Sequence, residues 1–185
     1  MSQTTWNIDT THSSVGFWVR HLVISKVHGR FTKWSGTIVL DESDITKSAV
    51  DVTIDAASIE THEEKRDAHL RSPDFFDVEQ HPEIAFESTR IEHVKKGDYR
   101  VEGELTMHGE THTVEFEVTV HGVTKDPQGQ DRVGLEARGT LSRSEFGLRW
   151  QQALETGGVL VGDEVRVSAD IAAVCTSPHA EGAAA

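Results

Sequence analysis

Apolar and polar residues alternate along most of this chain, which is the pattern of strands with one dry and one wet face. From position 99 to 107 the odd positions are mostly apolar, and the even positions carry charged or hydroxyl side chains. The same alternation occurs at 50–55, 113–120, 132–141 and 164–171. We therefore predict eight to ten strands in antiparallel pairing.

The dipeptide at 108–109, His-Gly, predicts a two-residue hairpin loop between two of these strands. Such a loop places Gly103 opposite Val114 and Val101 opposite Phe116, all on the apolar side. The turn and the alternation thus predict the same register for this pair of strands.

One helix is expected between the strands. Thr61 and Glu64 fit a capping box as N-cap and N3 residue, and the helix ends before Pro73. Phe75 and Phe76 follow at once. The helix either covers a barrel end with these two rings or is only packed down by them.

Glycines inside the strands favour a closed barrel over two packed sheets. The predicted fold class is all-β, an antiparallel eight-stranded barrel with one short helix covering an end. We expect one domain over 1–176 and a disordered tail over 177–185, which lacks large apolar residues. A barrel of this size is filled by side chains or holds one slender ligand, and alternation does not decide between them.

Charge and composition limit the classes of partner that we expect this protein to bind. With 18 Lys and Arg against 31 Asp and Glu, the net charge is −13, so the general surface repels phosphate backbones and anionic lipid headgroups. We expect no nucleic-acid partner and no stable membrane insertion, because no apolar run reaches about 20 residues. The absence of a secretory leader predicts a cytoplasmic protein. Cys175 is the only cysteine, which excludes an intrachain disulfide, and we expect it to be a small core residue.

The common catalytic motifs are missing: there is no phosphate loop, dinucleotide fingerprint or nucleophile elbow. His108, His112 and His121 suggest a metal site, but strand parity separates the last two, and we expect solvated histidines. The prediction is therefore no enzyme, no catalytic residue, no metal and no cofactor.

Trp18 stands between Phe17 and Val19, so this strand is apolar on both faces and needs a second cover. The helix, a loop or another subunit can supply it. We predict a homodimer in which Trp18 is partly buried.

Beyond these patterns, an ordered set of residues at consistent spacing is specific: Asp9, His12, Ser13, Val15, Phe17, Val19, His21, Leu22, Val27, Gly29, Phe31, Gly36, Asp41, Lys65, Arg66, Asp67, Leu70, Ser72, Phe75, Phe76, Asp77, Pro82, Ile84, Phe86, Ser88, Gly103, Leu105, Gly109, Val114, Arg143, Phe146 and Gly147. Through this set the chain resembles, from about 6 to 174, the YceI family of lipocalin-like, polyisoprenoid-binding barrel proteins. Val23 departs from the family, which commonly has glycine after the His-Leu pair.

The resemblance implies a lipocalin-like barrel, usually a dimer, that holds a long isoprenoid or similar lipid, such as a polyprenyl chain or an isoprenoid quinone. The expected function is that of a carrier or sequestering protein. A packed, non-binding barrel acting as a stress-related or protein-interaction module is the alternative. An enzyme that modifies the lipid's head is a weaker third reading.

Parity and resemblance together give the candidate site. Polar residues beside aromatic ones should form the mouth and meet a polar or anionic head: His21, Arg66, Phe75, Phe76, Arg143, Phe146 and Trp150. Apolar residues of the inward parity should line the lumen: Val15, Phe17, Val19, Val52, Ile54, Phe86, Val101, Leu105, Met107, Val114, Phe116, Leu135 and Leu141. Both arginines can instead serve the structure, by pairing with Asp67 or Glu145 or by tying loops to backbone carbonyls.

Overall fold

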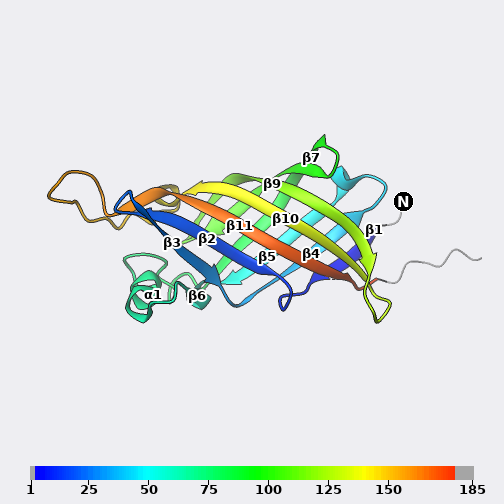
Figure 1. The fold of residues 1–185 in the computed structure, drawn as a ribbon, viewed down its shortest axis with the longest axis horizontal. Coiled ribbons are helices and arrows are strands. Elements are labelled where there is room, and N and C mark those ends of the chain that lie inside the picture. The colour runs from blue at the N-terminus through cyan, green and yellow to red at the C-terminus, as the bar shows by residue number, and fades with distance from the viewer. Residues whose placement is uncertain (1–2, 178–185) are drawn as a thin grey trace, which may run out of the picture.

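The structure, a computed structural model, describes residues 3–177. The predicted tail, apart from its first residue, lies outside the described residues. Within these residues, one α-helix, α1 (Glu64–Arg71), accompanies eleven strands (Figure 1). The strands are β1 (Gln3–Ile8), β2 (Ser14–His21), β3 (Ser25–Phe31), β4 (Trp34–Asp41), β5 (Ala49–Asp55), β6 (Ile59–Glu60), β7 (Glu83–Lys95), β8 (Asp98–Met107), β9 (Glu110–Lys125), β10 (Asp131–Ser142) and β11 (Val161–Cys175).

Eight of these strands close into an antiparallel ring. Its order is β1-β4-β5-β7-β8-β9-β10-β11, and β1 closes it by pairing with both β4 and β11. The predicted barrel is thereby confirmed. The strand count exceeds the prediction because β6, only two residues long, was too short to show alternation.

The strand β11 is longer than its neighbour β1, and this difference shapes the two ends of the barrel. At one end residues 173–175 of β11 pair with β1. Residues 161–170 pair with β2, whose other edge carries β3 and then β6. The barrel wall therefore continues on the β2–β3 hairpin where β1 has ended.

The β8–β9 hairpin has the predicted register, with Gly103 opposite Val114. Its loop has positive φ at both His108 (54°) and Gly109 (75°), as a two-residue turn between twisted strands requires. Gly103 is needed at its position because a Cβ there would lie 2.6 Å from the Phe86 ring. The missing side chain leaves room for that ring on the inner face of the barrel wall.

One end of the barrel is filled by a buried cluster. Trp6 and Ala173 are fully buried there, and Ile38, Leu40 and Val133 pack with them. The Trp6 indole N–H donates to the Thr4 hydroxyl at 2.7 Å, so its polar atom is satisfied. This cluster closes the end at which β1 lies (Figure 1).

The helix α1 begins later than the capping box predicted. Its N-cap is Glu63, whose carboxylate accepts from the backbone N–H groups of Lys65 and Arg66. Thr61 was expected in that role and is instead bonded to the buried carboxylate of Asp67, through both its N–H and its hydroxyl. The capping-box prediction was wrong because a carboxylate two residues later is the N-cap, so the helix begins two residues further along the chain.

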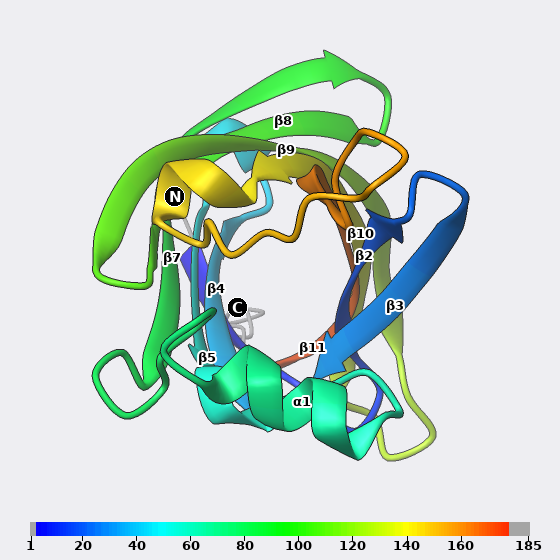
Figure 2. The ribbon, with the colours of Figure 1, turned by 90° about the vertical axis from the view of Figure 1, so that its left-hand side faces the viewer.

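The other end of the barrel is framed by α1 and by the segment that joins β10 to β11 (Figure 2). That segment begins with a short 3-10 turn, Arg143–Phe146, and continues as a loop over 147–160. We call this end the mouth. Within residues 3–177, no helix has the length and apolar character to cross a membrane.

Candidate functional site

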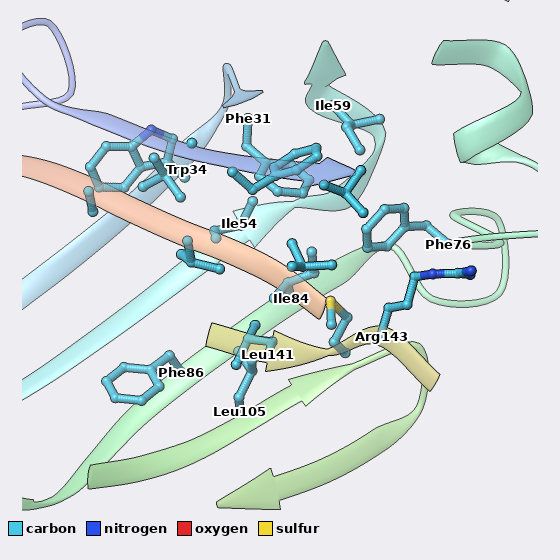
Figure 3. A pocket seen from close by; sticks show the side chains of 18 of the residues that line it. Phe31, Trp34, Ile54, Ile59, Phe76, Ile84, Phe86, Leu105, Leu141 and Arg143 are labelled. Carbon is cyan, nitrogen blue, oxygen red and sulfur yellow. The ribbon is translucent and has the colours of Figure 1, made fainter. Parts of the chain in front are cut away.

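A cavity of about 420 Å³ runs through the barrel interior and reaches the mouth. Near the closed end its wall is formed by Ile38 of the buried cluster and by Ile8, Leu135 and Ile171, which pack against that cluster. In the middle, aromatic and aliphatic side chains from several strands point inward, as Figure 3 shows. The cavity is therefore an apolar tube that is closed at one end.

The predicted lumen residues lie on this wall with one exception. Val114 has the inward parity but does not line the cavity; it packs against the buried cluster that contains Phe146. The ones that do line it are Val15, Phe17, Val19, Val52, Ile54, Phe86, Val101, Leu105, Met107, Phe116, Leu135 and Leu141.

The predicted mouth residues also gather at one end, again with one exception. Phe146 is 1% exposed and belongs to the buried cluster under the 3-10 turn rather than to the cavity wall. The others line the cavity: His21, Arg66, Phe75, Phe76, Arg143 and Trp150.

Among the described residues, the polar side chains of the cavity wall lie only at the mouth. Besides His21 and the two arginines, they are Thr61 and His69. They come from the end of β2, from the segment before α1, from α1 and from the 3-10 turn. Figure 3 shows the same polarity, with Phe76 and Arg143 at one end and Trp34 and Phe86 at the other. The tube thus has an apolar bottom and a polar rim.

Arg143 is the most buried charge at this rim, 7% exposed. Its guanidinium donates to the carbonyl oxygens of Gly162 (2.8 Å), Leu148 (2.7 Å), Trp150 (2.9 Å) and Val161 (3.3 Å). Burial lowers the pKa of this guanidinium, and the charge of Asp163 partly offsets the effect. Arg143 therefore ties the 147–160 loop to the start of β11, without the predicted pairing to Glu145.

Arg66 is held differently. Its guanidinium donates to the hydroxyl of Thr61 at 2.8 Å and to the Thr61 carbonyl at 2.7 Å. The predicted alternative partner, Asp67, reaches Arg66 only through the Thr61 hydroxyl they share. Arg66 is solvent-exposed, and within residues 3–177 its Nη1 has no hydrogen-bond partner. It can thus donate to a group at the mouth.

An aromatic contact bridges the mouth between the segment of α1 and the 147–160 loop. The Phe75 and Trp150 ring centroids lie 5.3 Å apart, and His69 meets Trp150 edge-on at 4.8 Å. Phe76 meets Phe31 of β3 edge-on at 6.1 Å. Phe75 and Phe76 therefore both pack the helix segment against the barrel and line the cavity at its mouth. The two roles predicted for these rings, covering the barrel end and packing the helix down, are compatible.

Several wall residues were not among the sequence candidates. Trp34 begins β4 and Ile59 lies in the two-residue β6, where no alternation is long enough to assign a face. His69 lies on α1 and also lines the cavity. Ala169 and Ile171 belong to an alternation that the sequence did show, and following that parity through β11 would have found them.

The histidines considered for a metal do not converge. His112 lies 3.2 Å from Glu110, and His121 lies 3.7 Å from Glu136 on another part of the barrel. Among residues 3–177, no three His, Cys, Asp or Glu side chains are grouped so as to hold a metal ion.

The closed antiparallel ring and its one-ended apolar cavity define the chain as a lipocalin-like barrel. The YceI-like domain model matches residues 6–173, and the chain belongs to this family. A UPF0312 protein of Staphylococcus epidermidis is 39% identical over 167 residues, which cover 90% of this chain and 95% of that protein. The predicted family is thereby confirmed.

Solved structures share the fold. BcnA of Burkholderia cenocepacia superimposes with a TM-score of 0.76 at 23% identity, covering 89% of this chain and 98% of that one. A polyisoprenoid binding domain from Saccharophagus degradans gives a TM-score of 0.69 at 14% identity, covering 94% and 99%.

Proposed function

We propose that this protein binds a long apolar isoprenoid-type lipid, a polyprenyl chain or an isoprenoid quinone, in its barrel and acts as a carrier or sequestering protein. The observation that carries the proposal is the polarity of the cavity: an apolar tube closed at one end, with polar side chains only at its mouth. An amphiphile with a long tail and a small head has the same distribution. The solved domain from Saccharophagus degradans, named for polyisoprenoid binding, supports the choice of lipid class.

The binding energy would come from removing the tail from water. At about 25 cal/mol per Å², enclosing roughly 300 Å² of apolar surface is worth about 7 kcal/mol before ordering costs. The cavity volume lies in the range of ligand pockets, roughly 300–1,000 Å³. A tail without hydrogen-bonding groups needs no polar partners along this wall.

The head would be met at the mouth by His21 and Arg66. Arg66 keeps unused donors and is exposed, whereas the Arg143 donors are largely occupied by backbone carbonyls. Arg143 would contribute its positive charge rather than a direct hydrogen bond. A guanidinium with free N–H groups favours an anionic or carbonyl-bearing head.

The alternative of a packed, non-binding barrel, acting as a stress-related or protein-interaction module, is disfavoured by the open interior. Small residues such as Ala137 line the tube, and side chains leave about 420 Å³ of it unfilled. A lumen filled by its own side chains would leave no such space. We also propose a binding rather than a catalytic role, in line with the YceI-like family match.

The homodimer stays a prediction. The Trp18 ring is half-buried on the outer face of β2, and the ammonium of Lys26 lies 4.2 Å from its centroid. Arg166 is directly opposite on β11. A two-fold contact through Trp18 would bring these cations near their own copies, which costs binding energy. Sedimentation at tens of micromolar, showing monomer only, would end this prediction.

Native mass spectrometry of freshly purified protein, followed by organic extraction, tests the function directly. We expect an added mass that ionises as a lipid in the extract and disappears from the extracted protein. Purified prenyl alcohol should then rebind, which the quenching or shift of Trp34 and Trp150 fluorescence reports, since both rings line the cavity. Protein that carries no lipid and takes up none would contradict the proposal.

A further inference from the structure

The turn between β2 and β3 projects apolar side chains into solvent at the mouth. Leu22, Val23 and Ile24, here called the hairpin tip, are 38%, 67% and 83% exposed. The backbone N–H of Leu22 donates to the Leu160 carbonyl at 2.9 Å, so the tip is joined to the 147–160 loop. That loop exposes Val159 as well.

Exposed large apolar side chains are concentrated at this end. Within residues 3–177 the only others are Val94 and Val123, which lie singly near the ends of β7 and β9 that point away from the mouth. Single exposed valines are ordinary on a protein surface, but adjoining ones mark a contact surface. The side-on view places the tip and the loop together at the far left of the molecule (Figure 1).

The backbone of the tip is strained. Leu22 and Val23 have φ of 55° and 65°, and the Ile24 N–H closes the turn on the His21 carbonyl at 3.3 Å. A β-branched residue at positive φ is a rare outlier that glycine would relieve. The exposed Val23 side chain does not contribute to the packing of the fold, so packing does not explain the strained backbone. Such strain therefore indicates a functional role for this side chain.

The charge around the tip is opposite to that of the whole protein. Residues 10–40 contain no Asp or Glu although the chain has a net charge of −13, and their basic side chains are Arg20, Lys26, Arg30 and Lys33. Arg20 and Lys26 lie directly opposite each other on β2 and β3, flanking the tip. Within residues 3–177 neither forms an ion pair, and both stand over the Trp18 ring.

The outer wall formed by β7, β8 and β9 is acidic by contrast. Glu87 lies directly opposite Glu104, and Glu102 directly opposite Glu115. Opposed carboxylates would repel an anionic surface, so the molecule presents one basic and one acidic side. A molecule with such a charge distribution orients itself when it approaches a charged plane.

We propose that the hairpin tip, with Arg20 and Lys26 as its basic collar, docks the mouth on an anionic lipid bilayer. Leu22, Val23 and Ile24 would enter the boundary between headgroups and acyl chains, and the two cations would meet lipid phosphates. The general surface repulsion expected from the net charge is weaker here, because residues 10–40 carry no carboxylate and the nearby Glu164 is paired with Arg166. The docking is peripheral and reversible, without a spanning segment.

This inference extends the proposed function and rests on it, because docking matters only if the barrel takes up a lipid from the bilayer. His21, the residue before the tip, lines the cavity, and so do Leu160 and Val161 beside it. Docking at the tip therefore brings the cavity's mouth to the membrane surface. A lipid tail would then pass from bilayer to barrel with little exposure to water, which lowers the barrier for transfer.

The test is co-sedimentation with vesicles of equimolar phosphatidylcholine and phosphatidylglycerol, and with vesicles of phosphatidylcholine alone. We expect the wild type to bind the anionic vesicles more strongly and to be released by salt. Arg20→Gln and Lys26→Gln should each weaken binding about fivefold. The pair Val23→Gly and Ile24→Ser should weaken it at least about tenfold.

Two controls separate docking from misfolding and from lipid uptake. Val23→Gly relieves the strained turn, so it should keep or raise the thermal midpoint while lowering vesicle binding. Val94→Ser removes a valine that is 54% exposed, away from the mouth, and should leave vesicle binding unchanged. The tip variants should keep their affinity for detergent-solubilised prenyl alcohol but extract it from vesicles more slowly.

Three results would overturn the docking proposal. They are a wild type that ignores anionic vesicles, tip variants that bind them as well as the wild type does, and tip variants that only convert a dimer to monomer, which would make the tip a contact for a second copy. The failure of the lipid-binding function is distinguishable, because it shows as absent prenyl alcohol binding in detergent whatever the vesicles show.

Discussion

Ala137 of β10 and Ala169 of β11 lie directly opposite each other, and both side chains line the cavity. Two adjoining positions of the barrel wall therefore carry only a methyl group. The neighbours along the same faces, Leu135 and Val167, are larger. At this level of the tube the lumen has room that a bulkier pair would fill.

Ala169→Trp is accordingly expected to block lipid uptake. An indole grown from this wall occupies existing space rather than displacing packed neighbours, so the barrel should still fold. Prenyl alcohol binding, measured by competition with a fluorescent lipid, should fall by at least about tenfold, since a loss of only about 1.4 kcal/mol has that effect. The β-rich circular dichroism spectrum should stay unchanged.

Ser168→Trp is the matched control. Ser168 is the neighbouring residue on β11 and has the opposite parity, facing outward beside Arg138. The same side chain added there should leave uptake as in the wild type. Val101 and Leu105 also have the inward parity, but both are already buried and packed. A tryptophan at either position would therefore disturb the fold more than one at Ala169 would. If uptake survives the Ala169 substitution, the lumen is not the binding site.

The sequence predicted the barrel and most of its wall because both depend on a period of two. Once the β8–β9 turn set the register, as with Gly103 and Val114, each inward position followed from parity. Parity failed for Val114 itself, which packs against the buried cluster around Phe146 and does not line the cavity. That cluster depends on how the 3-10 turn around Phe146 folds back, a tertiary contact that alternation does not encode.

The mouth was harder to predict because its residues lie on loops and short elements. Arg143 could pair with a carboxylate, a lipid head or backbone carbonyls, and residue type alone favours none of them. The carbonyls that it binds belong to a loop whose path no local pattern reveals. The N-cap of α1 shifted from Thr61 to Glu63 for a similar reason, since Asp67 bonds the threonine.

Affinity should rise with tail length and then level off. The closed end at Trp6 limits how far a tail can enter, and each CH₂ group buried before that point adds up to about 0.8 kcal/mol, roughly a fourfold change in Kd. A series of prenyl alcohols with increasing numbers of isoprene units, titrated against tryptophan fluorescence, measures this. A Kd that is independent of tail length, or that keeps falling for the longest tails, would argue against a one-ended tube.

Arg66 and Arg143 should respond differently to replacement by methionine, which keeps the apolar stem and removes the charge. Arg143→Met leaves up to four backbone carbonyls without their donor, each worth about 1–3 kcal/mol if it stays buried, so the thermal midpoint should drop sharply. Arg66→Met removes two bonds to Thr61 at an exposed site and should cost far less stability.

The same two variants test the head-binding role. Arg66→Met should weaken binding of an anionic prenyl phosphate more than that of the corresponding neutral alcohol, because only the charged head uses the guanidinium. Thermal melts measure the stability of both variants, and titrations with the prenyl phosphate and the prenyl alcohol, run in parallel, measure their lipid affinities. If both variants bind both lipids within twofold of the wild type while stability falls, the arginines serve only the structure.

The closed end of the barrel should lose stability in acid through Asp9. Its carboxylate accepts from the Thr11 hydroxyl (2.5 Å), from Arg132 (2.8 Å) and from the His12 ring (2.8 Å), and these contacts hold the pKa of Asp9 well below its usual range. Arg132 also donates to Asp126 at 2.8 Å, joining the β1–β2 turn to the β9–β10 turn.

A carboxyl group whose pKa is lowered by folding stabilises the folded state fully above its unfolded pKa of about 3.9, and the contribution is lost as the pH falls below that value. Asp9→Asn should therefore lower the urea midpoint clearly at pH 7. The gap from the wild type should narrow as the pH is taken below about 4. Asp51→Asn, at an exposed carboxylate on β5, is the control and should show a small gap at either pH. A gap for Asp9→Asn that is equally wide in acid and at neutral pH would mean that its loss acts through packing rather than through the charge network around Arg132.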